Sequence, residues 1–209
     1  MWEFEPKELV GRRVVLRPLR PEHARGLLAA ADHDEVFTWL PFPRFMDLDE
    51  VDAWIEAALD ERQRGRRIPF VVEQTADGAL VGSTSLRNLD TRNRGVEVGS
   101  TWISRAAWGV GANPESKLLL MGFAFESLGL ERVFLRADNL NRRAQVAHEN
   151  LGAVREGIHR HEVLRRDGSW CDSIHYSVLR GEWPQVRRRL LMRLDPGPNG
   201  LQPSSGEAP

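Results

Sequence analysis

A glycine-containing segment that leads into an apolar helix constrains the fold of this chain more than any other feature. The segment covers residues 102–113, and Asn113 is followed by Pro114. Asparagine is a preferred helix N-cap and proline is best tolerated at the first helical position, so these two residues predict the start of a helix. The residues after them are apolar nearly all round, which predicts a helix buried on most sides: Leu118, Leu119, Leu120, Met121, Phe123, Ala124, Phe125 and Leu128.

The same segment predicts a seat for an anion. Gly109 and Gly111 lack a Cβ atom, so a ligand can approach the main chain closely. The unpaired amides and the dipole at a helix N-terminus both favour phosphate. From the residues alone, a tight turn without a ligand explains the segment equally well. A Walker-type loop is excluded because the segment lacks a Gly-Lys-Ser/Thr ending, and a Rossmann fingerprint requires glycine or alanine where Pro114 stands.

The composition is that of a soluble globular protein. The chain has 209 residues, of which 41% are hydrophobic and 28% are charged. Its formal net charge of −1, from 29 basic and 30 acidic residues, argues against nucleic acid as an electrostatic partner. The single cysteine, Cys171, excludes an internal disulfide and a multi-cysteine metal site, and we expect it to pack in a strand.

Neither a membrane span nor secretion is expected. No apolar run is long enough to cross a membrane, and the first residues lack the basic and apolar regions of a secretory signal. We therefore expect a cytoplasmic protein. Residues 1–194 are expected to form a single domain, whereas residues 195–209 are rich in proline, glycine and serine and are expected to be disordered.

Hydrophobic periodicity and turn residues predict the order of the remaining elements. Strands are expected at residues 13–19, 68–73, 79–86, 96–103, 131–137, 154–164 and 170–179. Besides the central helix, helices are expected at residues 21–30, from residue 47 to the basic run 62–67, at 142–150, and from residue 181 to about 194. The aromatic segment 36–46, broken by two prolines, is not expected to be regular throughout.

Several short stretches occur in a recognisable order and spacing. They are Val96-Glu97-Val98-Gly99, Trp108-Gly109-Val110-Gly111, residues 123–133, Asn141 with Leu151-Gly152-Ala153 ten residues later, Arg155-Glu156-Gly157, Asp167-Gly168, Asp172, Tyr176-Ser177-Val178 and Glu182-Trp183. With the element order βααββββαβαββ and a glycine loop after the fourth strand, they resemble the GNAT N-acetyltransferase family, in its RimJ/RimL-type branch of ribosomal-protein N-terminal acetyltransferases. The resemblance covers about residues 10–190. It implies an α+β fold, the acyl-CoA N-acyltransferase fold, with a mixed seven-stranded sheet and here an added C-terminal helix.

The resemblance also implies that acetyl-CoA is the acyl donor. The pyrophosphate of coenzyme A would lie on the amides of the glycine loop, and the pantetheine arm would bond the main chain where the fourth strand splays from the fifth. Asn141 would touch the pantetheine or the phosphates. The implied coenzyme-binding residues are Ile103, Trp108, Gly109, Val110, Gly111, Ala112, Asn113 and Asn141.

The implied reaction is acetyl transfer to a primary amine, at a protein N-terminus or on a small molecule, by direct attack on the thioester. The segments expected to line the acceptor site, 36–46 and 87–95, carry no motif, so the acceptor stays open, as does a homodimeric state. The chain departs from the family at Pro114, which has no amide, at Ala144, where many relatives have serine, and at Ala153, which replaces an aromatic residue. Ala144 keeps a second interpretation open, a regulatory or acyl-CoA-binding module without efficient turnover.

An amine must lose a proton before it attacks, because the reference pKa is about 8 for an α-amino group and about 10.4 for lysine. Glu97 is the predicted general base, since the resemblance places it close to the reacting groups. The other titratable candidates are His148, His159, His161 and Tyr176. His159, His161 and His175 form a conceivable metal cluster on two neighbouring strands, but without a carboxylate pattern nearby we expect no metal.

Overall fold

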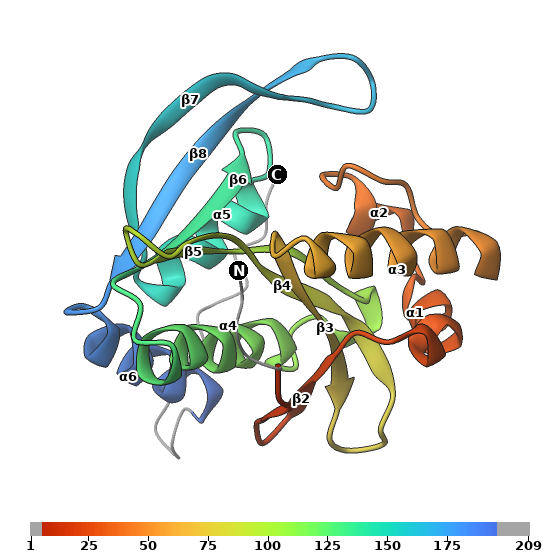
Figure 1. Cartoon of the computed structure of the whole chain (residues 1–209), viewed down its shortest axis with the longest axis horizontal. Coiled ribbons are helices and arrows are strands. Elements are labelled where there is room, and N and C mark those ends of the chain that lie inside the picture. Colours follow the sequence, from red (N-terminus) through yellow and green to blue (C-terminus); the bar gives the residue numbers. More distant parts are fainter. Residues whose placement is uncertain (1–5, 196–209) are drawn as a thin grey trace, which may run out of the picture.

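The computed structural model describes residues 6–195 of the chain, and these build one mixed sheet (Figure 1). Within the described residues the sheet has eight strands in the order β1-β2-β3-β4-β5-β6-β8-β7. All neighbours pair antiparallel except β5 and β6, which are parallel. The strands are β1 (Leu9–Val10), β2 (Val14–Pro18), β3 (Arg67–Gln74), β4 (Leu80–Asp90), β5 (Gly95–Ile103), β6 (Arg132–Asp138), β7 (Val154–Leu164) and β8 (Trp170–Leu179).

Helices cover both faces of this sheet (Figure 1). They are α1 (Ala24–Ala30), α2 (Asp34–Phe37), α3 (Leu48–Gln63), α4 (Ala112–Gly122), α5 (Arg142–Leu151) and α6 (Trp183–Leu194). Two single turns of 3₁₀-helix, η1 (Pro21–His23) and η2 (Arg105–Ala107), precede α1 and α4, and a π-helical turn, η3 (Phe123–Ser127), extends α4. None of the helices in residues 6–195 combines the length and apolar character that crossing a membrane requires.

The predicted element order is correct in outline and wrong in two places. The described sheet has eight strands and not seven, because the two residues of β1 pair with Leu16 and Val15 of β2. Two residues are too few to show the alternation on which a strand prediction depends. In addition, three helices and not two separate β2 from β3, since residues 34–37 form α2. Three strands separate α3 from α4, as in the predicted residue ranges, and not the four written in the order βααββββαβαββ.

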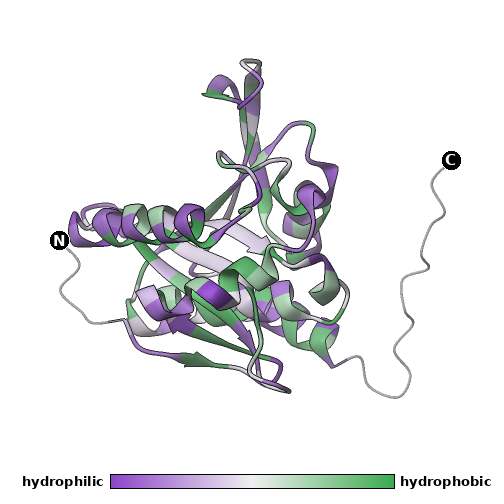
Figure 2. Ribbon diagram, turned by 90° about the vertical axis from the view of Figure 1, so that its right-hand side faces the viewer, coloured by the Kyte–Doolittle hydropathy of each residue, from purple (hydrophilic) through white to green (hydrophobic). Residues whose placement is uncertain are grey.

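Alternation along the strands divides the core between the two faces. In β3, Ile68, Phe70 and Val72 pack on the face covered by α4 and α6, while Val71 packs on the opposite face against α1 and α3. Phe37, Phe45 and Trp102 join this second cluster, so the aromatic segment is largely a packing unit. Figure 2 shows hydrophobic stretches along the strands and mixed colouring along the helices, as expected for helices with one buried face.

The two parallel strands separate soon after they meet. β5 and β6 pair only at Gly95–Arg132, Val96–Val133 and Glu97–Phe134. β6 then stays with β8 along its whole length, while β5 stays with β4 and carries an irregularity at Ser100, whose φ is +47°. The β6-facing edge of β5 beyond Glu97 therefore has no partner strand among the described residues, and this splay is the one that the family resemblance implied.

Candidate functional site

The glycine loop enters α4 through two residues in the left-handed region. Gly109 has φ +81° and Gly111 has φ +90°, values that favour glycine. Gly111 is the N-cap, so α4 begins at Ala112, and the prediction that Asn113 caps the helix is wrong. The side-chain oxygen of Asn113 is buried without a hydrogen-bond partner among the described residues. Pro114 is therefore the third helical residue, where an amide has no intrahelical acceptor anyway.

The amides of this loop form a row of unused donors. Among the described residues, none accepts a hydrogen bond from the backbone N–H groups of residues 109–113, and the first amide bonded in the helix is that of Glu115, to the Gly111 carbonyl. Five consecutive free amides at a helix N-terminus, where the dipole is also positive, make a site for a phosphate group.

Trp108 joins this loop to the end of the splayed strand. Its indole nitrogen donates to the carbonyl oxygen of Ile103 at 2.8 Å. The guanidinium carbon of Arg143, in the first turn of α5, lies 3.0 Å from the centroid of the Trp108 ring, and that of Arg105 lies 4.6 Å from it. Arg105 also pairs with Glu35. Two cations thus contact Trp108, the residue that precedes the free amides, which adds to the attraction for an anion.

Carboxylates brace the loop at both ends. Asp32 accepts hydrogen bonds from the Ser104 hydroxyl at 2.7 Å and from the amides of Arg105 and Ala106 at 3.0 and 3.1 Å. Burial alone would raise the pKa of Asp32, but these three hydrogen bonds lower it, so its charge is retained.

At the far end, the buried Glu115 of α4 accepts from the amides of three consecutive residues at the start of β2, Arg12, Arg13 and Val14, at 3.1, 2.6 and 2.7 Å. Arg12 and Arg13 precede the strand, and Val14 is its first residue. The loop is therefore held in position by the fold and not by a ligand.

Glu97 lies where β5 and β6 diverge, and its side chain is buried. Both carboxylate oxygens are engaged. Arg136 of β6 donates at 2.9 Å to one and at 3.1 Å to the other, and Asn88 donates at 2.6 Å. The predicted base is therefore one half of an ion pair and has no free oxygen in this arrangement.

Lys117 is a buried titratable residue of this region that the sequence interpretation missed. It lies on the sheet-facing side of α4 with Leu120 and Met121, and its ammonium donates to the Thr101 hydroxyl of β5 at 2.8 Å. Burial lowers the pKa of Lys117 to about 7, an effect that the negative charge of Glu97 partly offsets. The available signal was its spacing, since residues 117, 120, 121 and 124 share one helical face that is otherwise apolar.

The titratable candidates other than Glu97 fall into two groups. His148 is buried, its Nε2 atom lies 3.4 Å from the Arg136 carbonyl, and burial together with the nearby charge of Lys117 lowers its pKa to about 4. Tyr176 is a core residue whose hydroxyl donates to Glu149 at 3.4 Å. His159 and His161 lie on the β7–β8 hairpin, away from the loop. Cys171 is buried, as expected of a packing residue.

Asn141 caps α5. Its side-chain oxygen accepts from the amide of Ala144 at 3.0 Å, and Arg143 of the same turn contacts Trp108. The structure thus brings together most of the residues implied for the coenzyme, namely Ile103, Trp108, the loop and the α5 N-terminus. Glu97 lies earlier on β5, at the vertex of the splay.

A separate cavity of about 730 Å³ lies against the other side of α4. It is lined by Arg12, Arg13, Leu118 and Leu119 among others, and the described residues around it include none of the predicted coenzyme-binding residues or Glu97. The loop and the splay, and not this cavity, are therefore the candidate site.

Comparison with known families agrees with this geometry. A family model described as "Acetyltransferase (GNAT) domain" matches residues 13–154. The chain belongs to the GNAT acetyltransferase family. As a GNAT protein it is an N-acetyltransferase, which favours the enzyme over a module without turnover, and the RimJ/RimL-like branch is supported by its relatives.

The relatives of this GNAT protein cover nearly all of its described length. A Bacillus subtilis (strain 168) protein named "Putative ribosomal N-acetyltransferase YdaF" is 30% identical over 178 residues, which are 83% of this chain and 95% of that protein. A GCN5-related N-acetyltransferase from Brucella melitensis has a TM-score of 0.87 at 28% identity, covering 96% of this chain and 92% of the other. Mycobacterium smegmatis RimJ, solved in complex with CoA-disulfide, has a TM-score of 0.72 at 25% identity, covering 85% and 88%.

Proposed function

We propose that this chain transfers an acetyl group from acetyl-CoA to a primary amine by direct attack of the amine on the thioester. The observation that carries the proposal is the row of five free amides at residues 109–113, which opens onto the helix dipole of α4. GNAT acetyltransferases use acetyl-CoA, and the solved structure of RimJ contains a form of CoA. The acceptor is proposed to be a protein N-terminus or a small-molecule amine.

The described residues offer partners for two parts of coenzyme A, its phosphates and its pantetheine arm. The five amides, with Arg105 and Arg143 beside them, suit the phosphate groups. The unpaired edge of β5 from residue 98 to Ile103 offers main-chain donors and acceptors to the amides of a pantetheine arm, as an added strand would. Since the oxygen of Asn141 caps α5, its proposed contact is made through the side-chain NH₂ group. When bound, acetyl-CoA supplies an activated thioester.

Glu97 is proposed as the general base, acting directly or through one water. Its place on a strand, where β5 and β6 diverge, would keep its carboxylate at a fixed distance from the proposed thioester site. Accepting a proton weakens its pairing with Arg136, and Arg136 has a second carboxylate in reach, since its Nη1 atom is 3.5 Å from Glu162. The same unpaired edge of β5 offers N–H groups for the developing oxyanion.

The proposal is tested with the purified chain, acetyl-CoA, and a panel of small amines and peptides with different N-terminal residues. Calorimetry measures coenzyme binding, and thiol release measures turnover. We expect one acetyl-CoA bound per chain, and thiol release that depends on one class of amine. Absence of acetyl-CoA binding would overturn the assignment of the loop. Binding without amine-dependent thiol release from any member of the panel would overturn the proposed acceptor class.

A further inference from the structure

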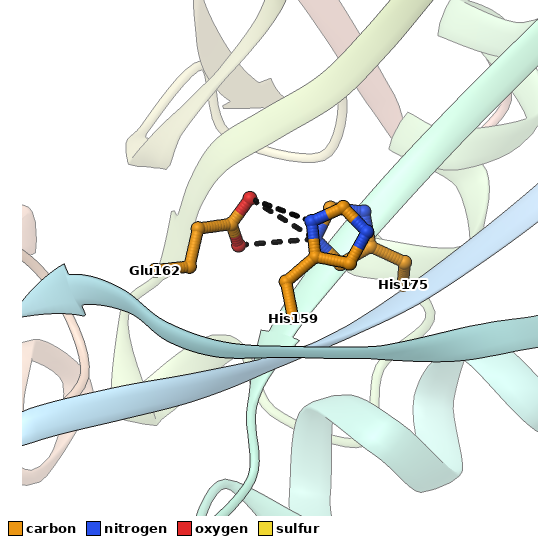
Figure 3. A group of neighbouring side chains, drawn as sticks. All are labelled: His159, Glu162 and His175. Carbon is orange, nitrogen blue, oxygen red and sulfur yellow. Dashed lines mark hydrogen bonds and ion pairs between the residues drawn. The ribbon is translucent and has the colours of Figure 1, made fainter.

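Two histidines and a glutamate meet on one face of the β7–β8 hairpin (Figure 3). A carboxylate oxygen of Glu162 is 3.0 Å from Nε2 of His175 and another is 3.4 Å from Nδ1 of His159. The two imidazole rings are stacked with their centroids 3.7 Å apart. One nitrogen or oxygen atom from each residue lies within 4.8 Å of the other two.

A bulge in β7 creates this group. Between His159 and Val163 the chain advances four residues, while the partners on β8, Ser173 and Cys171, are two apart. In a regular strand, residues 159 and 162 would point to opposite faces, and the bulge brings them to the same one. His161 takes the displaced conformation, with φ +52° and its amide bonded to Asp172 at 2.9 Å.

The same bulge removes His161 from the group. Its ring stacks on Trp170 instead, with centroids 5.6 Å apart. The cluster of three histidines considered from the sequence is therefore wrong, because that cluster assumed an unbroken strand. The carboxylate that the sequence pattern lacked is supplied by Glu162.

The group has the composition and spacing of a transition-metal site. Two imidazole nitrogens and one carboxylate oxygen are ligands that zinc takes in sites with an open fourth position. Tetrahedral ligands at zinc distances of about 2.0–2.2 Å lie roughly 3.3–3.6 Å from one another. The separations from Glu162 to His175 and to His159 already lie close to this range. His159 has a mostly exposed side chain, so its ring is free to tilt out of the stack toward an ion.

The charges around the group favour a dication. Glu162 contributes a carboxylate whose two oxygens contact the two imidazole rings. The one cation that contacts it among the described residues, other than the two histidines, is Arg136, at 3.5 Å. Arg136 is also paired with Glu97, so it retains one carboxylate partner if the Glu162 side chain rotates to bind a metal ion. Glu97, Arg136 and Glu162 together carry a net charge of −1.

We propose that His159, Glu162 and His175 bind one divalent transition-metal ion of the zinc class, with the fourth position open to water. His175 pairs with Arg136 across β8 and β6, and Arg136 holds Glu97. A single residue, Arg136, would therefore separate an ion on His175 from Glu97. The proposal does not depend on the proposed acetyl transfer, and its test uses no activity measurement.

The test titrates metal-free, untagged protein with Zn²⁺ by calorimetry and with Co²⁺ by visible absorption. We expect one ion per chain and the absorption of Co²⁺ bound by nitrogen and oxygen. His159→Asn, Glu162→Gln and His175→Asn should each weaken Zn²⁺ binding at least tenfold. His161→Asn is the matched control, because His161 is on the same hairpin but outside the group, and it should bind Zn²⁺ like the wild type.

Binding no tighter than millimolar in the wild type would overturn the proposal. So would an equal loss in His161→Asn and His159→Asn, since that would indicate nonspecific binding by hairpin histidines. Because His175 is partly buried and its variant can lose stability, circular dichroism accompanies every titration. If His175→Asn does not fold, the exposed His159 and the isosteric Glu162→Gln decide the outcome.

Discussion

The ammonium group of Lys117 is one of two lysine amines in the chain, and the other, on Lys7, is exposed. Lys117 reaches the Thr101 hydroxyl from α4, and burial lowers its pKa to about 7. The other 27 basic residues are arginines, which keep their proton at any working pH. Lys117 is therefore the basic side chain beside the splay that changes charge near neutral pH.

The stability of the protein should report this titration. An unfolded lysine keeps its proton to about pH 10.4, so between pH 7 and 10 the unfolded state binds more protons and stability rises with pH. Relative to Lys117→Met, the wild type should gain up to about 1.4 kcal/mol of unfolding free energy per pH unit across this window. Urea denaturation of both proteins measures the difference, and Lys7→Met is the control. If the difference in unfolding free energy between the two proteins does not change with pH, the lowered pKa of Lys117 is contradicted. NMR of the lysine side chains measures this pKa directly, because the chain has only two lysine signals.

Because both carboxylate oxygens of Glu97 accept hydrogen bonds, a substitution at this position affects an ion pair as well as the proposed base. Glu97→Gln keeps the shape and removes the basicity, so we expect turnover to fall roughly 10²- to 10⁴-fold with acetyl-CoA affinity nearly unchanged. It also breaks the pair with Arg136. Glu156→Gln is the matched control, because Glu156 pairs with Arg132, which lies on β6 like Arg136. Steady-state kinetics and calorimetry on both variants decide the role. If turnover of Glu97→Gln is near normal across the pH range, Glu97 is structural.

At the scale of elements, the loop and the first turn of α4 are anchored to the rest of the fold at both ends. Asp32 holds the beginning of the loop and Glu115 holds the first turn of the helix, so the amides between them stay in place without a ligand. Gly11 permits the second contact, since a Cβ atom there would lie 2.6 Å from a Glu115 oxygen. The energetic cost of ordering the site is thus met by folding and not by coenzyme binding.

Gly109 is a better position than Gly111 for a substitution that tests this loop. A Cβ atom at Gly111 would meet the Arg13 and Leu194 side chains at 3.0 and 3.2 Å, whereas one at Gly109 meets nothing within 4 Å. Gly109→Asp should weaken acetyl-CoA binding at least tenfold, because its charge repels phosphate. Gly109→Asn has the same shape and tolerates positive φ, so it should lose much less. Calorimetry compares the two, and equal losses would show that backbone conformation and not charge is responsible.

At the scale of the whole molecule, local patterns predicted most of the fold and only part of the site. The strands and the glycine loop could be predicted because each depends on residues close together in the sequence, such as Gly109 and Gly111. Lys117 was missed because its importance depends on which helical face is buried, and Glu162 because a bulge reverses its direction. Neither the partners of a buried charge nor a bulge is visible in hydrophobic periodicity.

The single domain of residues 1–194 stays a proposal, and the expectation of disorder at 195–209 lies outside the described residues except for Asp195. Asp195 pairs with Arg12 at 3.0 Å, and both side chains are largely exposed, so the pair is worth about 0–1 kcal/mol. Deleting residues 195–209 should therefore change the melting temperature by at most about 2–4 °C. Calorimetric melting of both chains measures it. A larger drop would show that the segment docks on the domain. The site to examine would then be the cavity described above against α4, which Leu191 and Leu194 of α6 also line.

The burial of Lys117 has a consequence for the protein in the presence of its own reagent. A thioester such as acetyl-CoA modifies exposed lysine amines without help from an enzyme. Among the described residues, Lys7 is the one lysine that solvent reaches, because Lys117 is enclosed between α4 and β5. Guanidinium groups form the rest of the basic surface and are inert to acyl transfer at neutral pH. The folded chain therefore offers acetyl-CoA a single lysine amine, so that peptide mass analysis after long incubation should find no more than one acetylated lysine.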